Sequence, residues 1–149
     1  MSIKTISEQN NYTAIDLGNL ADLGNYEHKG PDGKLFCTGK VFLKDAIKST
    51  GSQISYNLLL PGQGAPFFHS HTQNEEVYCF ISGNGEYQVG ETVFPIKEGS
   101  VVRVGTNTSH SLKNTGSAPL IFLCIQNKEG SLSDERDGVI EQTEPKFSK

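Results

Sequence analysis

Apolar residues along this chain gather in short runs separated by polar or turn-forming residues, and little of the pattern has a helical spacing. Runs such as Val77-Tyr78-Cys79-Phe80-Ile81 are rich in β-branched and aromatic residues, which favour strands. The pattern predicts a succession of short strands, over residues 34–43, 53–60, 67–71, 76–82, 86–89, 91–95, 100–104, 109–114 and 120–126.

The residues between these runs are of the kind that closes tight turns. Pro61-Gly62-Gln63-Gly64, Gly83-Asn84-Gly85 and Thr115-Gly116 all supply residues that tolerate a positive φ. Hairpins at this spacing are typical of a β-sandwich or a β-barrel. The predicted fold class is therefore all-β, with antiparallel strands.

The pattern also divides the chain into a core and two ends. A length of 149 residues is typical of one domain, and we expect residues 1–149 to form a single domain with its core at about residues 34–126. Residues 1–33 form an N-terminal arm, to which we assign no firm structure. Within it, residues 17–24 form either a short helix or an extended segment. Residues 127–149 are a polar tail that either packs loosely on the outside or is disordered.

Charge and composition exclude several classes of partner. The formal net charge is −4, so the chain lacks the basic footprint of a nucleic-acid-binding protein. It also has no apolar run near the roughly 20 residues that span a bilayer, and no signal-peptide core near Met1. The 3 cysteines are widely spaced, without a CxxC pair. These features predict a cytoplasmic protein with reduced cysteines that binds neither nucleic acid nor membrane.

The histidines carry the candidate chemistry. His69 and His71 lie at positions i and i+2 of the predicted strand 67–71, so both imidazoles face the same side. The alternative without a metal site is a pair of solvent-facing histidines. However, Phe67 would share their face, and a large aromatic residue there favours an inward orientation. A carboxylate from Glu75-Glu76 can return beside the pair after a turn, and His110 can supply a third imidazole. Imidazoles with one carboxylate suit divalent Fe, Mn, Ni, Co or Zn. His28 lies alone in the arm.

These residues resemble the cupin family, here a small single-domain member with a conserved barrel. The first cupin motif is matched by Gly62, His69, His71, Glu76 and Gly83, with the first glycine one residue out of register. The spacing to Gly83 selects Glu76 over Glu75.

The second cupin motif is matched by Gly99, His110 and Asn114. Gly105 replaces its proline and Asn107 replaces its glycine. Asparagine can adopt the left-handed conformation that the glycine would provide. The resemblance implies an antiparallel jelly-roll β-barrel that holds one divalent transition metal through His69, His71, Glu76 and His110.

Strand parity places Tyr78 and Phe80 on the side of Glu76, and Leu112 and Asn114 on the side of His110. Glu76 and Tyr78 are therefore the candidate catalytic residues, although Tyr78 is otherwise explained as a core aromatic, and Asn114 as a brace for a turn. We expect Tyr56, Arg103 and Gln126 to face outward rather than line the mouth of the barrel. Of these, Arg103 is the one to test against anionic substrates.

We expect a metal-dependent enzyme of the dioxygenase type that acts on a small polar metabolite. The alternatives are a non-redox isomerase or lyase of sugars or sugar acids, and a cupin that binds a small molecule without turnover. No bound organic cofactor is expected. The N-terminal arm resembles the strand that some cupins place on a partner's sheet, which predicts a homodimer.

Overall fold

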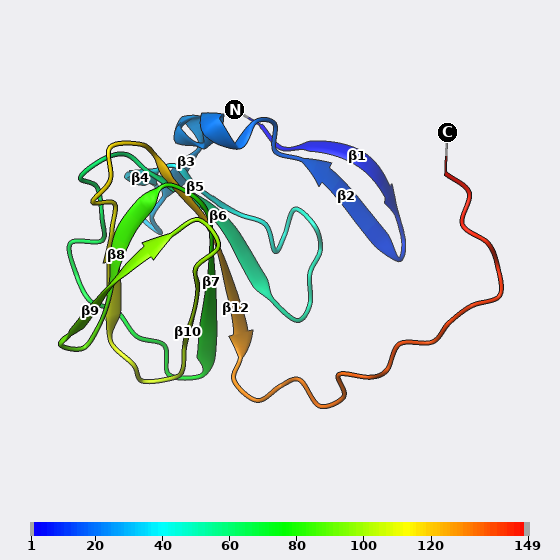
Figure 1. Cartoon of the computed structure of the whole chain (residues 1–149). Helices are drawn as coiled ribbons and strands as arrows, with labels where there is room; N and C mark the ends of the chain where they lie inside the picture. Colours follow the sequence, from blue (N-terminus) through cyan, green and yellow to red (C-terminus); the bar gives the residue numbers. More distant parts are fainter. Residues whose placement is uncertain (1, 148–149) are drawn as a thin grey trace.

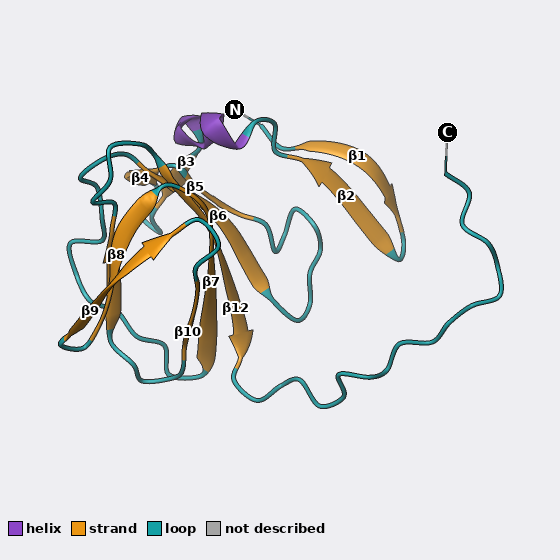
Figure 2. Cartoon of the chain, in the orientation of Figure 1, coloured by secondary structure: helices purple, strands orange, loops and turns teal. Residues whose placement is uncertain are grey.

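The computed structural model describes residues 2–147 and consists mostly of β-strands (Figures 1 and 2). The larger sheet has five antiparallel strands, in the order β10 (Val101–Val104), β7 (Asn74–Ser82), β12 (Leu120–Lys128), β6 (Gln53–Leu59) and β5 (Lys40–Phe42). The smaller sheet contains β11 (His110–Lys113), β8 (Asn84–Val89) and β9 (Thr92–Lys97). The remaining elements are the hairpins β1 (Lys4–Gln9) with β2 (Tyr12–Asp16) and β3 (Glu27–Lys29) with β4 (Leu35–Thr38), and the 3₁₀-helix η1 (Leu20–Asn25).

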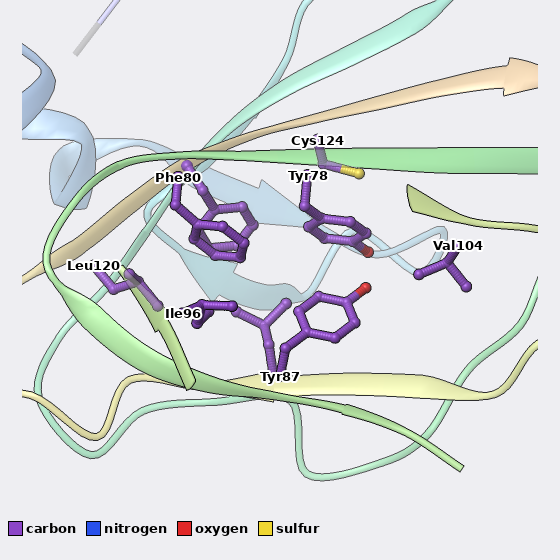
Figure 3. Packing of buried hydrophobic residues seen from close by; sticks show 9 residues of the cluster. Tyr78, Phe80, Tyr87, Ile96, Val104, Leu120 and Cys124 are labelled. Carbon is purple, nitrogen blue, oxygen red and sulfur yellow. The ribbon is translucent and has the colours of Figure 1, made fainter. Parts of the chain in front are cut away.

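The main hydrophobic core lies between these two sheets (Figure 3). Alternate residues of β7, Tyr78 and Phe80, point into it from the larger sheet, and Tyr87 of β8 points into it from the smaller sheet. This alternation is the period-2 pattern of strands that bury one face. The fold is thus the antiparallel jelly roll that the sequence predicted.

A second hydrophobic cluster covers the other face of the larger sheet. Leu58 and Ile121 point out of β6 and β12 into this cluster, where they meet Leu23 of η1 and Tyr26. The short helix begins after Asn19, whose side chain accepts a hydrogen bond from the backbone N–H of Ala21. Part of the arm, for which the sequence predicted no firm structure, therefore covers a sheet face.

The predicted strand 34–43 is interrupted. Gly39 separates β4 from β5 at a φ of 76°, and a Cβ at this position would lie 2.4 Å from the carbonyl oxygen of Leu58. A residue with a side chain can satisfy neither constraint at low cost.

The prediction of a strand over residues 67–71 is wrong. Within this segment only His69 forms a bridge to β11, with His110, and the preceding isolated bridge joins Gly64 to Lys113. Between the two bridges, residues 65–68 lie opposite residues 111–112, so a regular ladder cannot continue. Phe67, which we expected to face inward, is exposed.

After Glu129 the chain contains no regular strand or helix within the described residues, and its large apolar side chains, such as Leu132 and Ile140, are exposed. The trace of this tail runs away from the body of the molecule (Figure 1). In the part of the chain that the structure describes, no helix is long and apolar enough to cross a membrane.

Candidate metal centre

The four predicted ligands lie around one buried carboxylate. Glu76 enters the barrel near the start of β7, and His110 opens β11 on the facing sheet. His110 Nε2 lies 2.9 Å and His69 Nε2 lies 3.6 Å from Oε2 of Glu76. His71 Nε2 lies 3.2 Å from the other oxygen, Oε1. The loop and the smaller sheet therefore direct three imidazoles at Glu76 on the larger sheet.

Three of these residues form a tighter group than all four. One donor atom each from His69, Glu76 and His110 lies within 4.8 Å of the others, which is a separation that one metal ion can bridge. His71 does not belong to this group, although its ring centroid lies 5.5 Å from that of His69. His71 approaches the centre from the side of Oε1.

The hydrogen bonds of His110 define how it faces the carboxylate. Its Nδ1 lies 2.9 Å from the carbonyl oxygen of Thr108, an acceptor, so Nδ1 carries the proton. In the neutral imidazole, Nε2 is then an acceptor that faces another acceptor, the oxygen of Glu76. This arrangement needs a cation between the two atoms, either a second imidazole proton or a metal ion. His69 also fits a metal site, because its Nε2 faces Glu76 while its buried Nδ1 has no partner within the described chain.

The pKa values of the pair agree with this need for a cation. Burial raises the pKa of the Glu76 carboxyl, but hydrogen bonds from His110, His69 and Tyr78 lower it by more, so its pKa lies well below the usual range. Burial lowers the pKa of His110, while its contacts with Glu76 and Thr108 raise it by more. Glu76 is therefore ionised, and the centre attracts positive charge.

Tyr78 and Cys124 complete the surroundings of the carboxylate. The hydroxyl of Tyr78 donates a hydrogen bond of 2.8 Å to Oε2 of Glu76 and lies 3.2 Å from His110 Nε2. The thiol of Cys124 donates to Oε1 at 3.4 Å. Burial raises the pKa of Tyr78, and it raises the pKa of Cys124 to about 12, so both groups keep their protons. Strand parity found Tyr78 correctly, whereas Cys124 was interpreted only as a small apolar residue.

Two further residues near the centre were not predicted. Gln126, expected to face outward, instead places Nε2 at 3.0 Å from the ring nitrogens of His71. Gln126 pairs in register with Glu76, and Cys124 pairs in register with Tyr78. Cross-strand register would therefore have found Gln126 and Cys124. Tyr87 stacks parallel to the His110 ring, at 6.1 Å between centroids, and its buried hydroxyl has no hydrogen-bond partner among the described residues.

Other candidate residues stabilise the fold. Arg103 pairs with Glu75 and Glu129 on the outside, as expected for an outward-facing residue. Asn114 is fully buried and braces its turn through hydrogen bonds to the carbonyls of Leu59 and Ala118. Asn107 adopts a φ of 55°, which confirms the left-handed conformation expected there.

Tyr56 lies in the outer hydrophobic cluster, away from the core between the sheets. The three cysteines are free, as predicted: Cys37 and Cys79 are partly buried and Cys124 is buried.

A comparison with known protein families matches the segment that carries the four candidate ligands. A family model described as "Cupin domain" matches residues 57–126. An "Oxalate-binding protein" from Thermotoga maritima is 30% identical over 82 residues, which cover 55% of this chain and 67% of that protein.

Two solved structures are similar to larger parts of this chain. A cupin protein from Bacteroides fragilis is 34% identical with a TM-score of 0.66, and the match covers 78% of this chain and 98% of that one. A putative sugar phosphate isomerase from Acidithiobacillus ferrooxidans is 27% identical with a TM-score of 0.55, over 60% of this chain and 58% of that one.

Proposed function

This chain belongs to the cupin superfamily, and from that premise we propose that it binds one divalent transition-metal ion and, at that ion, a small chelating acid. The metal ligands in this proposal are His69, His71, Glu76 and His110. The metal is one of Fe, Mn, Ni, Co or Zn, as the mixed imidazole and carboxylate donors favour.

The observation that carries the proposal is the contact between His110 and Glu76. Because the Thr108 carbonyl holds the proton on Nδ1 of His110, the 2.9 Å contact between Nε2 and the Glu76 carboxylate inside the barrel needs a second imidazole proton or a metal ion. Three neutral imidazoles and one carboxylate leave a divalent ion with a net charge near +1. When bound, such an ion supplies a Lewis-acidic centre that attracts anions.

A small acid is the class of ligand that this centre suits best. The carboxylate of Glu76 is ionised and is contacted by the imidazoles and by the Tyr78 hydroxyl, so it acts as a metal ligand rather than as a proton donor. The Tyr78 hydroxyl keeps its proton, and it can donate a hydrogen bond to Glu76 or to an incoming oxygen. The similarity to an oxalate-binding protein supports an acid with two adjacent oxygens.

A reaction at the same centre is the second candidate, and the position of Tyr78 favours it. Its protonated hydroxyl lies within hydrogen-bonding distance of both Glu76 and His110, so Glu76 and Tyr78 can orient a substrate and hold a proton beside it. With iron, the expected activity is of the dioxygenase type. The similarity to a putative sugar phosphate isomerase supports instead a non-redox isomerase or lyase reaction with another metal.

The test begins with elemental analysis of tag-free protein purified without chelator from cells supplied with iron, manganese, nickel and zinc. His71→Ala is expected to lose most of the metal, whereas His28→Ala should keep it, because His28 packs against Phe36 and Phe42 outside the barrel. Calorimetry with oxalate then measures binding to metal-loaded and metal-free protein. Equal metal loss in both variants would refute the ligand assignment, and metal-independent oxalate binding would refute the proposed role of the ion.

Iron in the purified protein directs the next assay to oxygen uptake with thiols, enols and small aromatic compounds. Manganese, nickel or zinc directs it to the isomerisation of sugar acids. In either case a Tyr78→Phe variant that retains its metal should lose turnover if the second candidate is right. Unchanged turnover in that variant would exclude a catalytic role for the Tyr78 hydroxyl.

A further inference from the structure

The candidate metal centre opens toward the segment that carries its first two histidines. The side chains of His69 and His71 are 37% and 31% exposed, whereas those of His110 and Glu76 are only 1% and 8% exposed. The deep side of the centre is closed by the core residue Tyr78. A ligand must therefore enter past His69 and His71.

The residues directly before His69 form a loop at this entrance. Residues 65–68 span the gap between the two bridges to β11, and they lie opposite only two residues of that strand. Ala65 is held by backbone contact with Leu112 and by the hydroxyl of Ser111. Pro66 has no N–H to donate, and within the described chain Phe67 and Phe68 make no backbone hydrogen bond. Little backbone bonding holds the tip of this loop.

The loop presents two exposed aromatic side chains that come directly before His69 in the sequence. Phe67 is 50% and Phe68 is 48% exposed. The ring of Phe67 lies edge-on to that of His69, with 6.5 Å between their centroids. Exposed apolar side chains at the entrance of a binding site are a feature that marks ligand contact.

The charged groups near the other side of the entrance are already paired. Arg103 binds both Glu75 and Glu129, and Thr106 also donates to Glu129. The backbone N–H of Asn107 is bound to the carbonyl of His71. Arg103, the cation considered for anionic substrates, is therefore already neutralised by two carboxylates.

We propose that Phe67 and Phe68 are specificity-determining residues that bind the apolar tail of a ligand whose acid group lies at the metal centre. The inference rests on the proposed function and adds the class of ligand to it: an acid with two adjacent oxygens that carries an aromatic or branched apolar substituent. The rings contact this substituent. His69 and His71, one and three residues after Phe68, hold the ion. A bare dicarboxylate fills only the inner part of such a site.

Two 2-oxo acids with the same chelating head group and different tails provide the test. Isothermal titration of metal-loaded protein should show that phenylpyruvate binds at least about tenfold more tightly than pyruvate, since burying a phenyl group is worth this much or more. In the double variant Phe67→Ala/Phe68→Ala the ratio should fall to about twofold, with metal content and pyruvate affinity unchanged. The heat-capacity change should be more negative for phenylpyruvate, and this difference should disappear in the variant.

Phe36→Ala is the matched control. Phe36 is also an exposed phenylalanine, but it lies on β4 beside His28, outside the centre, so its removal should leave the ratio unchanged.

Equal affinity of the wild-type protein for the two acids would overturn the inference while leaving the proposed function intact. Absence of metal-dependent binding of pyruvate, phenylpyruvate and oxalate would overturn both. A wild-type ratio near one overturns the inference even if the double variant folds poorly. A ratio that survives in a folded double variant would also refute the role of the two rings.

Discussion

Removing the hydroxyl groups of Tyr78 and Tyr87 should change the stability of the metal-free protein in opposite directions. Both side chains are buried in the same core, and their ring centroids lie 5.2 Å apart. Figure 3 shows the two rings projecting from facing strands. The substitutions Tyr78→Phe and Tyr87→Phe each remove one oxygen atom, so the two variants differ only in what that oxygen contacts.

The contacts determine the expected magnitudes. The Tyr78 hydroxyl donates to the ionised Glu76 at 2.8 Å, and the loss of a hydrogen bond to a charged group costs about 1.5–3 kcal/mol. The Tyr87 hydroxyl is buried without a partner among the described residues. Its removal eliminates an uncompensated desolvation cost and should raise the free energy of unfolding by about 1 kcal/mol.

Chemical and thermal unfolding of the chelator-treated proteins, followed by circular dichroism, measures both effects. For a protein of this size, 1 kcal/mol corresponds to roughly 2–4 °C in Tm, so the two variants should be separated by at least about 5 °C. Tyr12→Phe is the surface control, because the Tyr12 hydroxyl contacts Ser7 in an exposed hairpin, and its effect should stay within about 0.5 kcal/mol.

Metal titration adds a second readout. Tyr78→Phe should weaken metal binding by about 10–100-fold, since Tyr78 orients the ligand Glu76, whereas Tyr87→Phe should leave it unchanged. Equal destabilisation by the two substitutions would refute the reasoning, because it would mean that the Tyr87 hydroxyl is as well bonded as that of Tyr78.

Three further predictions follow from the same structure. Lowered pH should weaken metal binding through protonation of the imidazoles. In the metal-free protein, the lowered pKa of Glu76 stabilises the fold above pH 4.5 and the raised pKa of His110 stabilises it below pH 6.5, so the metal-free protein should be most stable between these two pH values. The rise in Tm caused by metal should therefore shrink from pH 8 to pH 6. A rise in Tm that is independent of pH would contradict the assignment of imidazole ligands. Gly83→Ala should cost about 3 kcal/mol in a urea titration, because Gly83 has a φ of 86° and a Cβ there would lie 2.4 Å from the Pro119 carbonyl oxygen, while Gly51→Ala, which meets nothing within 4 Å, should be neutral. Light scattering should detect a homodimer at micromolar concentration that becomes monomeric on deletion of residues 2–16, because the exposed β1–β2 hairpin extends beside the barrel (Figure 1); a monomeric full-length chain would end that prediction.

The sequence by itself determined the all-β fold class, the three imidazoles around Glu76 and the inward position of Tyr78, although not the positions of Cys124 and Gln126. Short apolar runs between turn residues predict hairpins wherever a strand has a regular partner, and the period of 2 then gives the inward face, as it did for Tyr78, Phe80 and Leu112. Motif spacing selected Glu76 over Glu75, and the structure places Glu76 inside the barrel and Glu75 against Arg103 outside.

Only the tertiary structure decided what depends on the partner of each segment. Residues 67–71 are not a strand, because the segment opposite residues 65–68 is too short to pair with them, and this difference turned Phe67 toward solvent. The inward position of Gln126 follows from its register with Glu76, and the proton on Nδ1 of His110 follows from the nearby Thr108 carbonyl. Alternation along one chain reports which residues share a face, but register and loop length come from the neighbouring strand, and these position the atoms that a metal and its ligand would meet.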